Sequence, residues 1–170
     1  MEATAKTMDQ AVRVMTSREG KYLTFCLAGE EYGIGILKVK EIIGMMTVTS
    51  VPQTPGYVKG VINLRGKVIP VIDLRLKFGM ESIGYTDRTC IIVVDIRGGN
   101  REIQMGIVVD SVSEVLNIKP GEIEDTPTFG TRLDTDYILG MAKMAGGVKI
   151  LLDIDRVLSD REFQDVVGAA

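Results

Sequence analysis

YVKGVINLRGKVIPVIDL, residues 57–74, recurs in altered form as YILGMAKMAGGVKILLDI, residues 137–154. Upstream of each copy lies a second related pair, residues 33–42 and 106–115, in which glycine, aliphatic and glutamate positions match. Two related units therefore fill most of the chain, and a repeat at fixed spacing constrains the fold before any local pattern does. The copies differ at NLRG, residues 63–66, which corresponds to KMAG, residues 143–146. At this place we expect the two units to differ in function.

Both units are predicted to be rich in short β-strands. Alternating apolar residues bounded by glycine and proline indicate strands joined by tight turns. Pro70 lacks an amide proton, which places its strand at a sheet edge or a bend. Residues 37–43 fit either a short helix or a continued strand. The predicted strands cover residues 21–27, 32–36, 46–51, 60–64, 67–72, 88–96, 103–109, 112–118, 137–144 and 148–152.

The fold class is therefore mainly β, with two modules of about five short strands each, and such strands favour small barrels. Few helices are expected. Asp73 is a predicted N-cap of a short helix that Gly79 ends. Asp153 has the same place in the second unit and is predicted to begin a last helix that runs toward Phe163 or Val167.

The sequence also suggests how the chain is divided. Residues 1–19 are polar with a faint helical period, and we expect a flexible N-terminal tail rather than a docked helix. Residues 20–163 are predicted to form one domain, with a first barrel at about residues 20–82 and a second at 83–163. Exchange of strands between the two barrels is left open. Residues 164–170 are expected to form a C-terminal tail.

Composition excludes several classes of function. The 170 residues are 45% hydrophobic and 25% charged with a net charge of −3, which is typical of a folded globular protein and gives no support to nucleic-acid binding. No signal peptide or run of about 18 apolar residues is present, so we expect a cytoplasmic protein without membrane insertion. Histidine is absent, and the two cysteines, Cys26 and Cys90, are expected to be buried thiols. We therefore predict neither a zinc site nor any other metal or cofactor.

One segment resembles an enzyme motif. Asp153 and Asp155 follow a hydrophobic strand in the pattern of the nucleophile motif of haloacid-dehalogenase phosphatases. Only fifteen residues follow Asp155, and the matching position in the first unit is Asp73, a helix cap. A cap is therefore the preferred interpretation of Asp153, and the chain is predicted to have no catalytic residues.

Two charged residues lie within segments that are otherwise apolar. Glu41 lies in the apolar run 36–43, and Arg65 lies at the tip of an apolar hairpin. If the two units pack together, these opposite charges could form an ion pair. That pair could fix the geometry of a surface groove, or it could have only the structural role of neutralising the two charges. Glu41 has a counterpart in Glu114, but the counterpart of Arg65 is Ala145.

Read together, residues 33–42, 60–75 and 106–112 resemble the bacterial chemotaxis coupling protein CheW family. The NLRG and PVIDLR signatures in one hairpin are specific, and the resemblance spans about residues 21–158. It implies two five-stranded SH3-like β-barrels packed over a shared apolar core. It also implies a non-enzymatic adaptor that binds the cytoplasmic tip of methyl-accepting chemoreceptors and the regulatory domain of the histidine kinase CheA. Such a protein would be recruited to receptor arrays through these partners.

The resemblance also implies which residues contact partners. Kinase contact is expected on an exposed edge of the first barrel, where Val48 and Thr49 match weakly. Receptor contact is expected in the groove between the barrels, at Ile36, Val39, Glu41, Asn63, Leu64, Arg65 and Val109.

A second binding-class interpretation is a related domain of a longer signalling protein, such as the coupling domain of the kinase itself or a coupler fused to a receiver. The length of the chain argues against it, because no kinase or receiver portion is expected in 170 residues. The phosphatase remains the alternative from the enzyme class.

Overall fold

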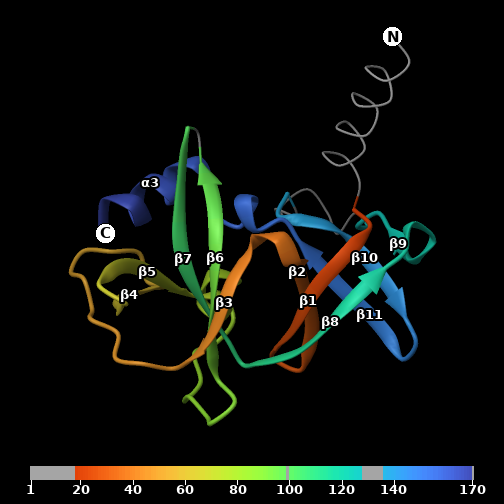
Figure 1. Cartoon of the computed structure of the whole chain (residues 1–170), viewed down its shortest axis with the longest axis horizontal. Coiled ribbons are helices and arrows are strands. Elements are labelled where there is room, and N and C mark those ends of the chain that lie inside the picture. Colours follow the sequence, from red (N-terminus) through yellow and green to blue (C-terminus); the bar gives the residue numbers. More distant parts are fainter. Residues whose placement is uncertain (1–17, 99, 128–135, 170) are drawn as a thin grey trace.

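The strands form two sheets that lie side by side along the long axis of the molecule (Figure 1). The structure is a computed structural model that describes residues 18–98, 100–127 and 136–169. Sheet A has the order β8 (Ser111–Ile118), β1 (Gly20–Leu27), β2 (Glu30–Gly35), β11 (Gly147–Leu152), β10 (Ile138–Met144) and β9 (Ile123–Glu124). Sheet B has the order β3 (Val39–Gly44), β6 (Cys90–Gly98), β7 (Arg101–Val109), β5 (Lys67–Asp73) and β4 (Val58–Leu64).

Short helices connect and cover the sheets. The α-helices are α2 (Leu74–Lys77) and α3 (Asp160–Ala169), and the 3₁₀ turns are η1 (Ile36–Lys38), η2 (Pro120–Glu122) and η3 (Ile154–Arg156). The mainly β fold class with two SH3-like subdomains and few short helices is thereby confirmed.

Each sheet combines strands from both sequence units. Strands β1 and β2 pair with β8 and β11, whereas β6 and β7 pair with β3 and β5. The sheets therefore do not follow the approximate units 20–82 and 83–163, and the exchange of strands that the sequence left open is present, because sheet B is the continuous stretch 39–109 and sheet A is built from the segments on either side of it. The two parallel ladders are related by the repeat: Val71 pairs with Gly106, and Leu151 pairs with Gly33.

The length of one connector explains this exchange. Only Asp110 separates β7 from β8. Val109 lies opposite Cys90 on β6, and the counterpart of Val112 in the first unit lies opposite Val94. If β8 took the equivalent place beside β6, Val112 would lie opposite Val94, on the far side of β6 from Val109. The distance from Val109 to that place is about 16 Å, which corresponds to four residues along β6 and two strand spacings across it. Three residues span at most about 11 Å, so β8 must pair in the other sheet.

The buried apolar side chains form three clusters. One lies within sheet B, around Ile69, Val71 and Val93, and one within sheet A, around Tyr22 and Leu151. The largest lies between the sheets and draws fully buried side chains from both, which makes it the shared core that the family resemblance implies. Its members include Phe25, Leu27, Ile34, Ile72, Leu74, Ile92, Val94, Met105 and Ile107.

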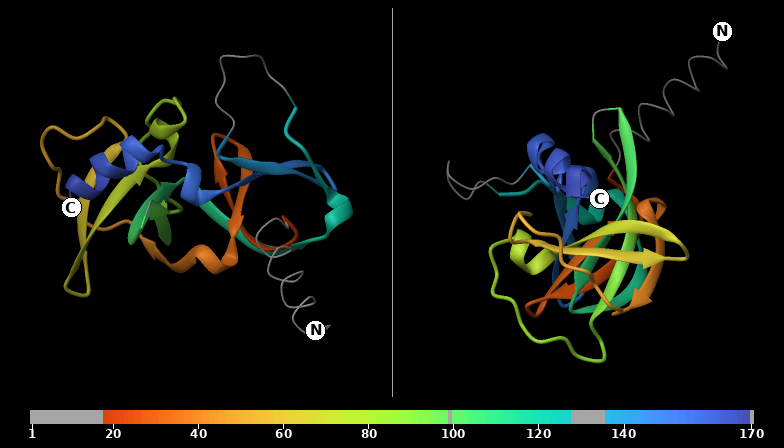
Figure 2. Two further views of the ribbon diagram at one scale, coloured as in Figure 1. Left: turned by 90° about the horizontal axis from the view of Figure 1, so that it is seen from above. Right: turned by 90° about the vertical axis from the view of Figure 1, so that its left-hand side faces the viewer.

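Helix α3 covers one end of the shared core above sheet B (Figure 2). Phe163 and Val166 are buried, and the ring of Phe163 packs so closely on Gly98 that a Cβ atom there would lie 2.5 Å from it. The predicted tail at 164–170 is therefore wrong for Val166. At the other end of the chain, most of the predicted tail 1–19 lies outside the described residues. Arg18 belongs to the folded part, because it forms an ion pair of 2.7 Å with Asp125.

Two predicted elements differ from the structure. The segment 46–51 is not a strand and makes a single bridge, between Thr49 and Val61. The ladder stops there because β4 has a bulge between Val58 and Gly60, and Gln53 has a positive φ of 61°. The helix predicted to start at Asp153 is interrupted, since η3 ends at Arg156 and α3 begins separately.

Pro70 and residues 37–43 show how local signals combine. Strand β5 is not an edge strand, but its parallel ladder with β7 begins at Val71, so Pro70 needs no donor on that side. Residues 37–43 contain both elements that the sequence left open, the end of η1 and then β3.

Gly60 is a testable requirement of the barrel in sheet B. Its φ is +141°, and a Cβ atom would lie 1.9 Å from the carbonyl oxygen of Thr49. We expect Gly60→Ala to lower the free energy of unfolding by at least about 2 kcal/mol in chemical denaturation, because backbone must shift to admit the methyl group. Gly56→Ala is the control, since open space surrounds Gly56. Equal stability of the two variants would contradict this account.

The connector residue Asp110 makes stability depend on pH. Arg75 donates from Nε and a terminal nitrogen to the Asp110 carboxylate at 2.7 and 2.6 Å, and the amide of Ala28 donates at 2.8 Å. The hydrogen bonds from Arg75 hold the pKa of Asp110 below its usual range, although burial opposes them. A carboxylate with a lowered folded pKa stabilises above its unfolded pKa and loses that contribution as pH falls through the folded value.

We therefore expect Asp110→Asn to cost about 2 kcal/mol of unfolding free energy at neutral pH. The difference from the parent protein should shrink as pH falls below the usual aspartate pKa. Urea unfolding of both proteins across that range measures it. A difference that stays constant with pH would show that ionisation of Asp110 does not matter.

Candidate partner-binding surface

The NLRG hairpin holds Arg65 at an exposed tip. Leu64 pairs with Lys67, so Arg65 and Gly66 form a two-residue turn, and their φ values of 52° and 86° are both left-handed. Arginine rarely adopts this conformation, which costs about 1 kcal/mol or more. The side-chain oxygen of Asn63 accepts a hydrogen bond of 2.8 Å from the amide of Gly66, which stabilises the turn. Asn63 thus helps to fix the position of Arg65.

Arg65 forms an ion pair with Glu41. The guanidinium donates to Oε2 of Glu41, with 70% of the Arg65 side chain and 28% of the Glu41 side chain exposed. The ion pair that the sequence suggested is thus present, but it lies within sheet B rather than between the units. Because β3 and β4 are the two edge strands of sheet B, the pair closes this barrel and leaves most of Arg65 facing solvent.

The other predicted receptor contacts lie in different environments. Ile36 and Val39 are half-buried against the shared core, Leu64 is half-buried against the sheet B cluster, and Asn63 is exposed. Val109 is 1% exposed because β7 is an interior strand that directs it into the shared core. The expectation that Val109 contacts a partner directly is therefore wrong.

Two exposed apolar residues near the predicted contacts were missed. Leu37 in η1 is 90% exposed, and Ile42 on β3 is 46% exposed. They flank Val39 and Glu41 in the sequence. For Ile42 the alternation with half-buried neighbours along β3 was a usable signal, whereas Leu37 in η1 gave none, because an apolar residue by itself does not indicate exposure.

Val48 and Thr49, the predicted kinase contacts, lie in the segment between β3 and β4. Thr49 is exposed, and its backbone pairs with Val61 at the outer edge of β4. Val48 is half-buried and lines a shallow surface hollow of about 940 Å³. We call this hollow the β3–β4 hollow. Its large exposed apolar side chains are Met46, Ile83 and Tyr85.

The segment that resembled a phosphatase motif has a structural role. The Asp153 carboxylate accepts a hydrogen bond of 3.1 Å from the amide of Asp155, which confirms the predicted cap. Asp73 likewise caps α2 by accepting from the amides of Arg75 and Leu76. The Asp155 carboxylate is bound by Lys38 and by the amide of Arg97. Across the described ranges, no group of three or more Cys, Asp or Glu residues could hold a metal ion.

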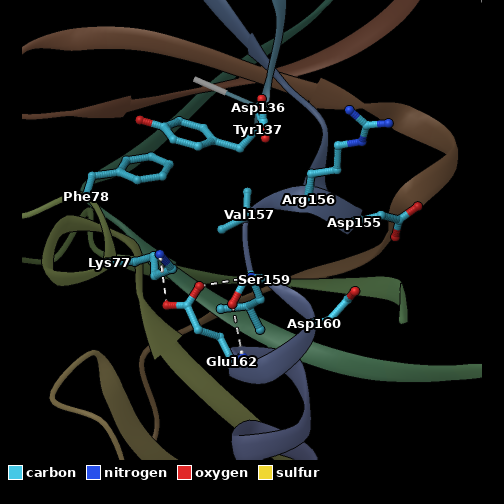
Figure 3. Close-up of a pocket in the computed structure, with 11 residues that line it drawn as sticks. Lys77, Phe78, Asp136, Tyr137, Asp155, Arg156, Val157, Ser159, Asp160 and Glu162 are labelled. Carbon is cyan, nitrogen blue, oxygen red and sulfur yellow. Dashed lines mark hydrogen bonds and ion pairs between the residues drawn. The ribbon is translucent and has the colours of Figure 1, made fainter. Parts of the chain in front are cut away.

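A second hollow, of about 560 Å³, lies beside this segment (Figure 3). Lys77 on α2 forms an ion pair of 3.1 Å with Glu162 on α3 across it. Burial raises the pKa of Glu162, but hydrogen bonds from the Ser159 amide and from Lys77 lower it overall. These contacts fasten α3 to α2.

Cys26 and Cys90 are free thiols and half-buried. Burial raises the pKa of the Cys90 thiol, which disfavours the reactive thiolate form. Among the helices of the described residues, none has the length and apolar character needed to cross a membrane.

Comparison with known proteins agrees with the fold and the hairpin signature. The family model of the CheW-like domain matches residues 21–162. Chemotaxis protein CheW of Klebsiella aerogenes is 44% identical over 150 residues, which cover 88% of this chain and 88% of that protein. Chemotaxis protein CheW of Bacillus subtilis is 36% identical over 148 residues, covering 86% and 92%.

A solved structure is also similar. The scaffolding protein TtCheW from Thermoanaerobacter tengcongensis superimposes with a TM-score of 0.73 at 36% sequence identity, over 85% of this chain and 95% of that one. The resemblance seen in the sequence is confirmed by the family match, by these relatives and by this structure. The chain therefore belongs to the CheW-like domain family.

Proposed function

We propose that the protein is a non-enzymatic adaptor that couples methyl-accepting chemoreceptors to the histidine kinase CheA in chemotaxis signalling. Its family, relatives named as chemotaxis proteins, and a structural neighbour described as a scaffolding protein support this role. The observation that carries the proposal is the Glu41–Arg65 pair, which holds a mostly exposed guanidinium beside half-buried aliphatic side chains. The protein acts in the cytoplasm, needs no cofactor, and reaches the membrane through its partners.

The receptor site is proposed along β3 and the NLRG hairpin. A receptor tip is a helical coiled coil, and helices bind to apolar surfaces that offer a few polar anchors. Ile36, Val39 and Leu64 supply apolar surface, while Glu41 and Arg65 supply charge. Asn63 acts by holding the turn. Val109 contributes only by supporting the shared core.

The kinase site is proposed on the outer edge of β4, at Val48 and Thr49. Within the described ranges only the Thr49–Val61 bridge covers this edge and leaves part of the β4 backbone unpaired, and such edges are available for association. The exposed Met46, Ile83 and Tyr85 of the β3–β4 hollow lie around Val48 and would bury apolar area with a partner. The regulatory domain of the kinase, which has a similar fold, is the proposed occupant.

Co-sedimentation with receptor signalling fragments and kinase, combined with a kinase assay, tests the coupling role. The protein should bring kinase into the receptor pellet and place its activity under receptor control. If correctly folded protein binds neither partner, the proposed function is wrong.

Reversing the charge of Arg65 should selectively weaken receptor binding. We expect Arg65→Glu to reduce receptor affinity by about tenfold or more, because it removes an exposed cation and repels Glu41. Kinase affinity and the melting temperature should change little, since Arg65 is outside the three cores. Arg161→Glu makes the same charge change on the exposed face of α3 and serves as the control.

The double variant Glu41→Arg/Arg65→Glu separates contact from structure. It can re-form the ion pair but still presents the wrong charge to a receptor, so receptor binding should remain weak. Full recovery of binding would mean that Arg65 acts only through the pair. Unchanged kinase control in the single variant would refute the assignment of Arg65.

Thr49→Lys should weaken kinase binding and spare receptor binding. The Thr49 side chain is exposed while its backbone makes the bridge to Val61, so the change places a charge on the proposed interface without removing a strand contact. Asn117→Lys, on β8 of the other sheet, is the matched control. Titration of labelled kinase regulatory domain measures the effect, and equal affinities for the two variants would refute this site.

A further inference from the structure

Two ion-pair clusters lie where the chain crosses between the sheets. In the first, the Asp110 carboxylate accepts hydrogen bonds of 2.6 and 2.7 Å from the guanidinium of Arg75 and one of 2.8 Å from the amide of Ala28. It joins the β7–β8 connector to α2 and to the β1–β2 turn. We call it the Asp110 clamp.

In the second cluster, Nζ of Lys38 lies 2.8 and 2.9 Å from the two carboxylate oxygens of Asp155, and the amide of Arg97 donates a hydrogen bond of 2.8 Å to the same carboxylate. It joins η3 to the connector between β2 and β3 and to the end of β6. We call it the Asp155 clamp. Each clamp therefore contains one carboxylate, one cation and one backbone amide.

The repeat relates the two clamps position by position. Arg75 and Asp155 are counterparts, each two residues after a capping aspartate. The amides are also counterparts, since Ala28 directly follows Leu27, the last residue of β1, and Arg97 follows the matching residue Ile96 near the end of β6. Lys38 lies one residue beyond the counterpart of Asp110. Two of the three positions are thus shared and the third is displaced by one residue, but the charges are reversed, because the connector residue is the anion Asp110 in one clamp and the cation Lys38 in the other.

The strands themselves cannot distinguish their partners. In one parallel ladder Val71 and Ile72 pair with Gly106 and Ile107, and in the other Leu151 and Leu152 pair with Gly33 and Ile34. These sets are interchangeable in pattern and similar in volume. By apolar matching alone, β2 could pair with β5 as well as with β11.

Connector length prevents β8 from pairing within its own unit, but it does not prevent exchange between two copies of the chain. If β2 of one copy lay beside β5 of another, Lys38 would face Arg75. If β7 of one copy lay beside β11 of another, Asp110 would face Asp155. Both contacts would bring like charges together.

We propose that the opposite polarity of the two clamps acts as a pairing code. It favours the native pairs β2–β11 and β7–β5, and it disfavours the pairs β2–β5 and β7–β11 between two copies of this chain. The four side chains are only 13–34% exposed, so solvent screens a wrong contact poorly. A domain swap that exchanges identical elements keeps β2 beside β11 and β5 beside β7, so it preserves both clamps, and the code acts only against the non-native pairs β2–β5 and β7–β11.

The variant Lys38→Asp/Asp110→Lys tests the code without changing net charge. Within one chain, the introduced lysine would face Arg75 and the introduced aspartate would face Asp155, whereas exchange between copies restores opposite charges at both clamps. We expect refolding at increasing protein concentration to yield a discrete dimer, measured by size-exclusion chromatography with light scattering. The parent protein should remain monomeric under the same conditions, with at least about a fivefold smaller dimer fraction.

Adding Arg75→Asp and Asp155→Arg to this variant provides the control, because the four changes invert the code and make both clamps complementary again within one chain. This protein should return to the monomer although it carries twice as many substitutions. A destabilised monomer at every concentration in the two-residue variant would overturn the proposal. So would aggregation or dimerisation that the four-residue variant does not relieve. Circular dichroism checks that each species keeps its β structure.

Discussion

The fold depends on the connector between β7 and β8, which is a single residue, Asp110. So short a link cannot return β8 to its own unit, so the chain must cross to the other sheet. Once it has crossed, β8 pairs with β1, and the apolar faces of both sheets enclose the shared core. The two barrels therefore cannot separate without breaking strand pairs in both. This rigidity suits the proposed role of a scaffold that holds two partners at fixed positions.

The repeat explains why the sequence predicted the elements well and their partners poorly. Hairpins, caps and the core pattern are local properties, and the copies reinforce each signal, as Asp73 and Asp153 do at equivalent caps. The choice between β5 and β11 as neighbour of β2 is not local, and both strands are equally apolar. Dividing the chain at residue 82 followed the repeat, whereas the sheets follow the connectors.

The candidate site shows the same limit. Glu41 and Arg65 could be paired from the sequence because two charges in apolar surroundings require partners. Val109 could not be recognised as buried, because its exposure depends on the position of β7 inside sheet B. Similarly, the apolar pattern of 46–51 suggested a strand. The number of residues in this segment that pair with β4 is limited by the bulge of β4 between Val58 and Gly60. In each case the missing information was the identity of a neighbouring strand.

The residues that differ between the copies lie where variation disturbs the fold least. Arg65 and Gly66 lie beyond the last pair of β4 and β5, Leu64 with Lys67, and Arg65 is stabilised there by Asn63 and Glu41 rather than by a core. A left-handed arginine gives the barrel no stability of its own. The equivalent hairpin of the second unit has Ala145, which is outside the left-handed region. The cost at Arg65 is therefore best understood as that of presenting a cation to a partner, on a barrel whose core does not require it.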